Sequence, residues 1–242
     1  MAIQRALATS PTADSATSTA TPTRTGPYGE AYTLLLGGDL GQFADEGSFY
    51  IVQTTTPGTG VAGHAAPVQA DLSTKPLIHC WNGNANQILI PKYIKVRLTA
   101  IGAGATTTDV EVWTETGAGA SSRASGGTLM SPSLNTRSDK AADAAVTYFG
   151  PVVSTLTSAK RLCHSRVRSV VPVVEDQYTI VFGDMAIGAN AGLPTTGTNQ
   201  LVAVVPMAPI AVYPGHNFQV HVWGASQSGA HSFDLEFGYV AR

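Results

Sequence analysis

The sequence predicts an all-β protein, an antiparallel sandwich of two sheets behind an extended N-terminal arm, and three observations carry this prediction. Apolar and polar residues alternate with a period of two in several segments, as expected for strands with one buried and one solvated face. The 25 glycine and 14 proline residues separate these segments in the way that turn residues do. No segment shows the 3.6-residue apolar period of an amphipathic helix.

The C-terminal part has the clearest strand pattern. Phe218, Val220 and Val222 alternate with three residues expected to face solvent, Gln219, His221 and Trp223, and Phe233–Tyr239 alternates in the same way after a turn. The other predicted strands are Tyr32–Leu36, Ser48–Thr54, Gln87–Ile90, Tyr93–Ile101, Thr108–Thr116, Val146–Phe149, Leu162–Val174, Tyr178–Phe182 and Leu201–Val205. About ten short strands without intervening helices predict two packed antiparallel sheets of jelly-roll type.

Two compositional zones divide the chain. Residues 1–27 consist mainly of Ala, Thr, Ser and Pro, a composition that buries too little apolar surface to fold alone. We expect them to form an extended arm that binds along a neighbouring subunit, and residues 28–242 to form one sandwich domain. Three long, glycine-rich loops are expected at 54–67, 117–145 and 183–200, where they suit contacts with other proteins.

Overall composition excludes several classes of function. The chain has 12% charged residues and a formal net charge of −2, which argues against a nucleic acid partner held through its phosphates. No run of about 18 apolar residues exists, so no membrane span is expected. Two cysteines are too few for a disulfide scaffold. Whether Cys80 and Cys163 pair across the sandwich is left open.

The histidines and cysteines do not predict a metal site. His79–Cys80 and Cys163–His164 are adjacent pairs, and adjacent residues on a strand point to opposite faces. The stretch from Gly215 to His221 resembles the start of the metal motif of the cupin family. Trp223 stands where that family has a second histidine, and Gln227 or Ser228 stands where it has a glutamate. The resemblance therefore favours jelly-roll topology without cupin chemistry, and no cofactor or metal is expected.

The acidic residues give little reason to expect catalysis. Asp109, Glu111 and Glu115 share the predicted polar face of one strand, and Glu175–Asp176 lie at a turn. Paired carboxylates are used in glycoside hydrolysis. A solvated face, or salt bridges to Lys95 and Arg97, is the simpler interpretation. Because the sequence contains no nucleophile motif and no phosphate-binding loop, we predict that the protein is not an enzyme.

Basic and aromatic residues on predicted outward faces suggest protein contacts. His164, Arg166 and Arg168 alternate along one strand beside Arg161, a row suited to ion pairs within the fold or across an interface. Exposed tryptophan commonly anchors a protein interface. The candidate interface residues are Arg5, Arg24, Trp113, Arg166, Arg168 and Trp223.

The block from Val205 to Gly215, VPMAPIAVYPG, followed by a hairpin that closes on Phe233–Tyr239, resembles the jelly-roll virion proteins of tailed bacteriophages. The resemblance covers about the last forty residues and implies a capsid-associated structural protein of the decoration or cement type. It further implies location in the virion, a homo-oligomer (a trimer), binding to the major capsid protein or other virion proteins, and no catalytic residues.

A carbohydrate- or receptor-binding module of a virion spike or fibre is the competing hypothesis, because β-sandwiches often carry such sites. In that reading Trp81, Trp113 and Trp223 stack on sugars.

Overall fold

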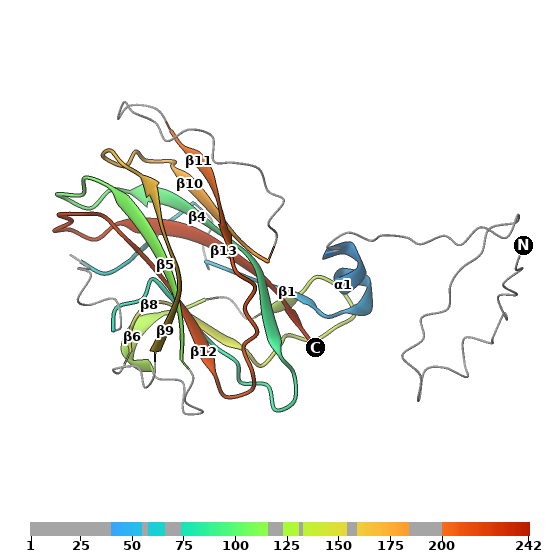
Figure 1. The fold of residues 1–242 in the computed structure, drawn as a ribbon. Helices are drawn as coiled ribbons and strands as arrows, with labels where there is room; N and C mark the ends of the chain where they lie inside the picture. The colour runs from blue at the N-terminus through green and yellow to red at the C-terminus, as the bar shows by residue number, and fades with distance from the viewer. Residues whose placement is uncertain are drawn as a thin grey trace, which may run out of the picture. The chain divides into compact units, whose positions relative to one another are not determined.

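A computed structural model describes residues 40–54, 58–65, 74–115, 123–130, 133–153, 159–183 and 200–242. Contacts divide the chain into two units, Met1–Gln42 and Phe43–Arg242, and both sheets belong to the second unit. The two sheets pack face to face, which confirms the predicted sandwich (Figure 1). The predicted arm, its boundary at residue 27 and the predicted strand Tyr32–Leu36 lie outside the described residues.

One sheet is seven-stranded and the other six-stranded. The seven-stranded sheet comprises β1 (Phe49–Gln53), β2 (Val61–Ala62), β4 (Leu89–Ala100), β7 (Leu134–Asn135), β10 (Gln177–Phe182), β11 (Val202–Met207) and β13 (Ser232–Ala241). The six-stranded sheet comprises β3 (Ile78–Trp81), β5 (Thr108–Glu115), β6 (Arg123–Leu129), β8 (Val146–Val153), β9 (Ala159–Arg168) and β12 (Asn217–Trp223).

Strand order follows a nested pattern. The seven-stranded sheet runs β11-β10-β4-β13-β1-β7, and the six-stranded sheet runs β6-β8-β3-β12-β5-β9. Eight strands form four nested pairs: β1 with β13, β3 with β12, β4 with β10, and β5 with β9. All of these pairs are antiparallel, whereas β10 and β11 run parallel.

The core lies between the sheets and consists of the predicted inward residues. Phe218 and Val220 of β12 face Phe237 of β13, and the rings of Phe218 and Phe237 meet edge to face at 5.4 Å. Val110 and Val112 of β5 are fully buried in the same cluster. Burial of each such side chain stabilises the folded protein by roughly 1.5–3 kcal/mol. Because turning a strand over would expose all of its apolar residues, the period-two pattern determines which face of each strand packs in the core.

Other parts of the sequence prediction were wrong. The expected loop 117–145 contains β6 and β7, which lack an alternating pattern because they are polar edge strands, and β6 carries glycines at positive φ (Gly126, 63°; Gly127, 76°). A short helix, α1 (Leu40–Glu46), ends at Gly47. Its seven residues are too few to show a helical period. Finally, β9 ends at Arg168, whereas a strand was predicted to continue to Val174.

Candidate functional site: interaction surfaces of the sandwich

The outer face of the six-stranded sheet carries a row of buried acids. Asp109 accepts hydrogen bonds from Arg166 Nε at 3.0 Å and His164 Nε2 at 3.2 Å. Glu111 accepts one from Trp113 Nε1 at 2.8 Å, and both carboxylates are almost inaccessible to solvent. The expectation of solvated acids on this face was therefore wrong. The alternative of ion pairs holds for both acids, with partners on β9 in place of Lys95 and Arg97: Asp109 pairs with Arg166, and Glu111 pairs with Arg161 at 3.5 Å.

Three interface candidates come together beside these acids. Trp223 lies opposite Asp109 on the neighbouring strand, and Asp109 in turn lies opposite Arg166. Arg166 has a side chain that is 54% exposed, and Trp113 is half-buried. Trp223 was expected to face solvent, but it is only 8% exposed and stacks on the His164 ring at 5.9 Å. The correction follows from its place on β12, a central strand on which all seven residues are buried.

Arg168 does not share the exposed face of Arg166. A register shift between Thr108 and Asp109 interrupts the pairing of β5 with β9, so strict alternation along β9 fails at this point. The Arg168 side chain is fully buried and donates from Nη1 to Asp176 Oδ1 at 2.9 Å. Arg168 is thus an internal structural residue, and its assignment to an exposed interface row was wrong.

Asp176 connects three strands, a role that the sequence did not reveal. Its carboxylate accepts hydrogen bonds from Arg168 of β9, from Tyr178 Oη of β10 at 3.1 Å and from the backbone N–H of Leu201 at 2.8 Å. It also accepts from the N–H of Val173 at 2.9 Å, which closes the preceding turn. Asp176 therefore fixes the point at which β11 begins. In the sequence, Glu175–Asp176 between two predicted strands indicated only a turn and not this buried hydrogen-bonding role.

The two cysteines are free thiols. Cys80 is fully buried, and this burial raises its pKa to about 12. Burial also raises the pKa of the half-buried Cys163 to about 11. Cys80 pairs in register with the inward residue Phe218, and His79 pairs with Gln219 on the opposite face, so adjacent Cys and His residues point apart as expected. Within the described ranges, no group of three or more His, Cys, Asp or Glu is placed to hold a metal ion.

β11 forms an unusual outer edge. The fifteen residues from Leu201 to Gly215 contain no charged side chain. Ala203, Val205 and Met207 point into the core, while Val202, which is 64% exposed, and Pro206 lie on the other side of the strand. β11 is thus apolar on both faces.

The backbone of β11 also has an unpaired side. The carbonyl of Leu201 accepts a hydrogen bond from Gln177 of β10, and that of Met207 accepts one from Gly183, directly after β10. The alternate residues Val202 and Val204 therefore direct their N–H groups away from β10. Pro206, at the next such position, has no N–H, which is the place that proline takes in an edge strand. Addition of a further strand along the full length of β11 is therefore blocked, and its apolar side chains remain the exposed feature.

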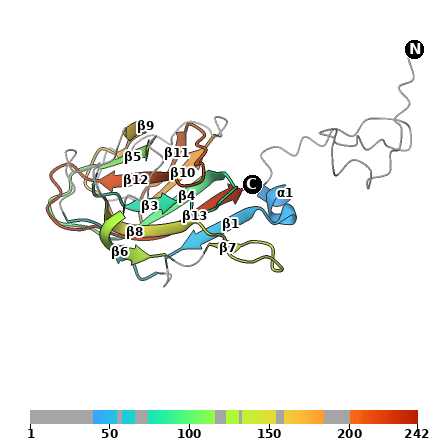
Figure 2. The same cartoon turned by 90° about the horizontal axis from the view of Figure 1, so that it is seen from below.

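The other outer strands are protected by charge, irregularity or short length, whereas β11 is protected by Pro206. β9 carries Lys160, Arg161 and Arg166, β6 is interrupted by two glycines, and β7 has only two residues. Charged residues, bulges and short length are the devices that keep edge strands from pairing with other chains. Figure 2 shows β9 and β11 along one side of the sandwich and β6 and β7 along the other.

A groove of about 350 Å³ lies beyond the end of β11. Pro209, Ala211 and Tyr213 form one part of its lining together with Leu162 of β9, and Tyr213 is 57% exposed. The remainder of the lining is polar or charged and includes Glu115 and Lys160. We use the term apolar flank for Val202, Pro206, Pro209, Ala211, Tyr213 and Leu162. Elsewhere, Leu129 and Leu134 are also exposed, but each stands among Gly, Ser, Thr or Asn residues, which is ordinary for single surface residues.

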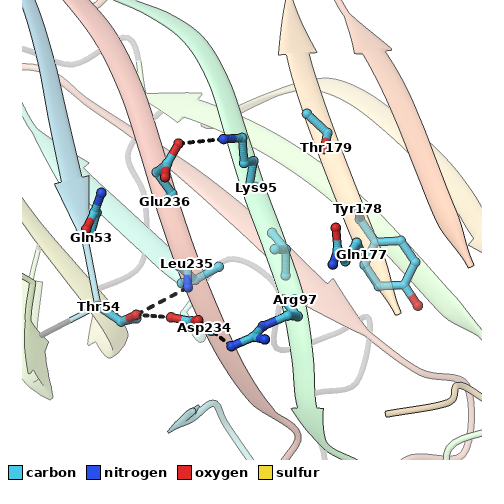
Figure 3. Close-up of a pocket in the computed structure, with 11 residues that line it drawn as sticks. Gln53, Thr54, Lys95, Arg97, Gln177, Tyr178, Thr179, Asp234, Leu235 and Glu236 are labelled. Carbon is cyan, nitrogen blue, oxygen red and sulfur yellow. Dashed lines mark hydrogen bonds and ion pairs between the residues drawn. The ribbon is translucent and has the colours of Figure 1, made fainter. Parts of the chain in front are cut away.

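A second groove, polar and about 240 Å³ in volume, crosses the outer face of the seven-stranded sheet (Figure 3). Arg97 of β4 donates to Asp234 of β13 at 2.8 Å and contacts Glu175 at 3.3 Å. Lys95 donates to Glu236 at 2.8 Å. These pairs hold the two basic side chains toward β13, as Figure 3 shows.

Hydrogen bonds keep the acids of this groove ionised. Burial raises the pKa of Asp234, but hydrogen bonds from Thr54, the Gly58 N–H and Arg97 outweigh burial and lower its pKa overall. Burial has the same effect on Glu236, where Lys95 and Tyr93 outweigh it, and the pKa of Glu236 is likewise lowered.

No family model, curated protein or solved structure matches the chain. No helix among the described residues is long and apolar enough to cross a membrane. Arg5 and Arg24, the remaining interface candidates, lie outside the described residues.

Proposed function

We propose that this chain is a structural protein without enzymatic activity, a jelly-roll component of a tailed-bacteriophage virion that decorates or cements the capsid. In this proposal it forms a homo-oligomer, a trimer, and binds the major capsid protein or other virion proteins. The observation that carries the proposal is the apolar flank: an uncharged edge strand, apolar on both faces, that continues into a groove.

The apolar flank favours a protein partner over a small ligand. Protein interfaces are depleted of charged residues at their centre and enriched in aromatic residues, and Tyr213 stands exposed on an uncharged segment. Covering these side chains removes apolar surface from water at about 25 cal/mol per Å². The partner we assign to the flank is another copy of the chain. In a closed trimer each contact is head-to-tail, so the flank of one copy meets a different surface of the next copy.

The nested strand pairing supports the jelly-roll part of the proposal. Pairing the first strand with the last, and so on inward, is what results when a long antiparallel hairpin rolls into two facing sheets. Jelly rolls serve as viral capsid domains and as lectins. The fold alone is therefore compatible with either function, and the chemistry of the surface has to distinguish a capsid protein from a lectin.

The carboxylates considered for catalysis are engaged elsewhere. Asp109 accepts hydrogen bonds from Arg166 and His164, and Glu111 accepts one from the Trp113 indole. Each carboxylate therefore orients side chains on the outer face. The pairing supports a structural role for this face.

Locating the protein on purified particles tests the proposal. Mass spectrometry of gradient-purified virions should detect the chain in many copies, and immunogold labelling should place it on the head surface. Absence from washed particles of a phage whose genome encodes it, with the protein present in the lysate, would refute the virion assignment. Labelling of the fibre base would retain a structural role but exclude capsid decoration.

A further inference from the structure

From the polar groove on the seven-stranded sheet we infer a second binding site, one that takes a neutral, polyhydroxylated ligand: an uncharged carbohydrate. The groove spans four neighbouring strands, β1, β13, β4 and β10, so rigid elements form its whole floor. Its position on the outer face of one sheet sets it apart from the core and from the groove of the apolar flank.

The charge of the groove excludes ionic ligands. Lys95 and Arg97 are balanced by Asp234 and Glu236, and Glu175 adds one further negative charge beside Arg97. An anion would meet this acidic excess, and a cation would compete with two basic groups already paired at 2.8 Å. A neutral ligand meets neither penalty.

Unused hydrogen-bonding groups face the same groove. Gln177 and Thr179 of β10 line it two residues apart, on one face of the strand. Among the residues that the structure describes, neither side chain has a hydrogen-bond partner. Glu236 Oε1 accepts hydrogen bonds from Lys95 and Tyr93, while Oε2 accepts no hydrogen bond within the described ranges. The site therefore offers an amide, a hydroxyl and a carboxylate oxygen, a mixture of donors and acceptors that suits hydroxyl groups.

The ion pairs hold the charged side chains of the groove in place before a ligand arrives. Arg97 is fixed by two carboxylates, and Asp234 is fixed by Thr54, the Gly58 N–H and Arg97. Groups that are already oriented lose less entropy on binding. Among the described residues that line the groove, the ring of Tyr178 is buried and no aromatic ring is free to stack on a sugar. We therefore expect affinity for a single saccharide in the millimolar range, near −4 kcal/mol. Display of many copies raises the effective affinity for a polysaccharide.

This site differs from the tryptophan surface of the competing hypothesis. Trp223 is buried and stacks on His164, so it offers no free ring face, while Trp113 is half-buried and donates its indole N–H to Glu111. The inference does not rest on the virion proposal. Carbohydrate binding would survive if the protein proved absent from particles, and a virion protein could lack the site.

Saturation-transfer NMR on the full-length chain tests the inference directly. The panel comprises maltotriose, cellotriose, laminaritriose, xylotriose and chitotriose, with a heparin oligosaccharide and a lysine trimer as charged probes. At least one neutral trisaccharide should show saturable transfer at millimolar concentration. A charged probe that binds more tightly than every neutral one would overturn the inference, as would no neutral binding at tens of millimolar.

Paired variants locate the site. Gln177→Ala with Thr179→Val should weaken binding by about thirtyfold, since it removes two hydrogen bonds of roughly 1 kcal/mol each. Thr128→Val, an exposed β-strand threonine on the other sheet, is the matched control and should leave binding unchanged. Because Gln177 is exposed and Thr179 half-buried, circular dichroism should show the wild-type fold. Wild-type affinity in the double variant would place any binding elsewhere and contradict the site.

Discussion

The guanidinium of Arg168 donates to the carboxylate of Asp176 across 2.9 Å, and both side chains are completely buried. The pair connects β9 of the six-stranded sheet to the turn before β10, and Asp176 also receives the N–H of Leu201. A buried ion pair is tolerated only when its remaining hydrogen-bonding groups are satisfied. Here the carboxylate accepts four hydrogen bonds, from Arg168, Tyr178, Val173 and Leu201.

Replacing Asp176 should destabilise the fold strongly. Asp176→Ala leaves the buried guanidinium without a counter-charge and should lower the free energy of unfolding by roughly 3–5 kcal/mol. Urea denaturation measures the change. Asp139→Ala is the matched control, because Asp139 pairs with Arg137 at 2.8 Å on the surface with both side chains exposed. Its cost should be at most about 1 kcal/mol. Equal costs for the two variants would mean that the buried pair has no special role.

Stability should fall as the solution becomes acidic through the histidine range. Burial lowers the pKa of His221 to about 3 and that of His231 to about 4, from an ordinary value of 6.5. Above pH 6.5 both are neutral in the folded and unfolded chains, so their contribution is fully present. Below pH 6.5 the unfolded chain gains protons that the folded chain refuses, and stability declines toward pH 4.

A variant isolates this histidine contribution. His221→Gln should reduce the slope of melting temperature against pH between 6.5 and 4. Gln219→Ala, on the same strand and equally buried, should lower the melting temperature at every pH without changing the slope. Superimposable slopes for wild type and His221→Gln would contradict the assignment.

The free cysteines should resist alkylation in the native protein. With pKa values raised to about 12 and about 11, Cys80 and Cys163 hold little thiolate at pH 8, and only the thiolate reacts. Iodoacetamide should modify the folded chain at least about tenfold more slowly than the urea-unfolded chain. Mass spectrometry should find Cys163 modified first, since it is half-buried and Cys80 is fully buried. Preferential labelling of Cys80 would contradict the burial described here.

The proposed N-terminal arm provides a separate test. Deleting residues 2–27 should leave the melting temperature of the sandwich nearly unchanged, because their composition buries little apolar surface. Attachment to particles should weaken, since ordering an extended segment costs roughly 1–2 kcal/mol per residue and only a partner surface offsets it. Unfolding of the truncated chain, or undiminished attachment, would show that the arm is not an anchor.

Period-two patterning was sufficient to predict the sandwich and most of its core. Val110, Val112, Phe218 and Phe237 are all buried where alternation placed them. Alternation failed on the outer face of the six-stranded sheet, because it reports only that a residue is polar. It cannot reveal that Asp109 is covered by side chains from another strand.

The edge strands and the grooves could not be predicted from the sequence, for related reasons. β6 and β7 are polar and irregular, so they read as loop. The bulge that removes Arg168 from the row of Arg166 depends on pairing with β5. The polar groove joins residues from four strands spread between Gln53 and Glu236, and only the strand order brings them together. The apolar flank was visible as an uncharged block, but its place on an outer edge was not.

Sedimentation of flank variants tests the central claim, that the chain assembles with other copies through the apolar flank. Wild-type protein at micromolar concentration should sediment as an oligomer, a trimer of the 25.0 kDa chain. Val202→Lys with Tyr213→Lys should yield the 25.0 kDa monomer, while Leu129→Lys, at a residue 55% exposed on the opposite side, should sediment as wild type does. A monomeric wild type, or an oligomer that survives the flank changes, would contradict the account.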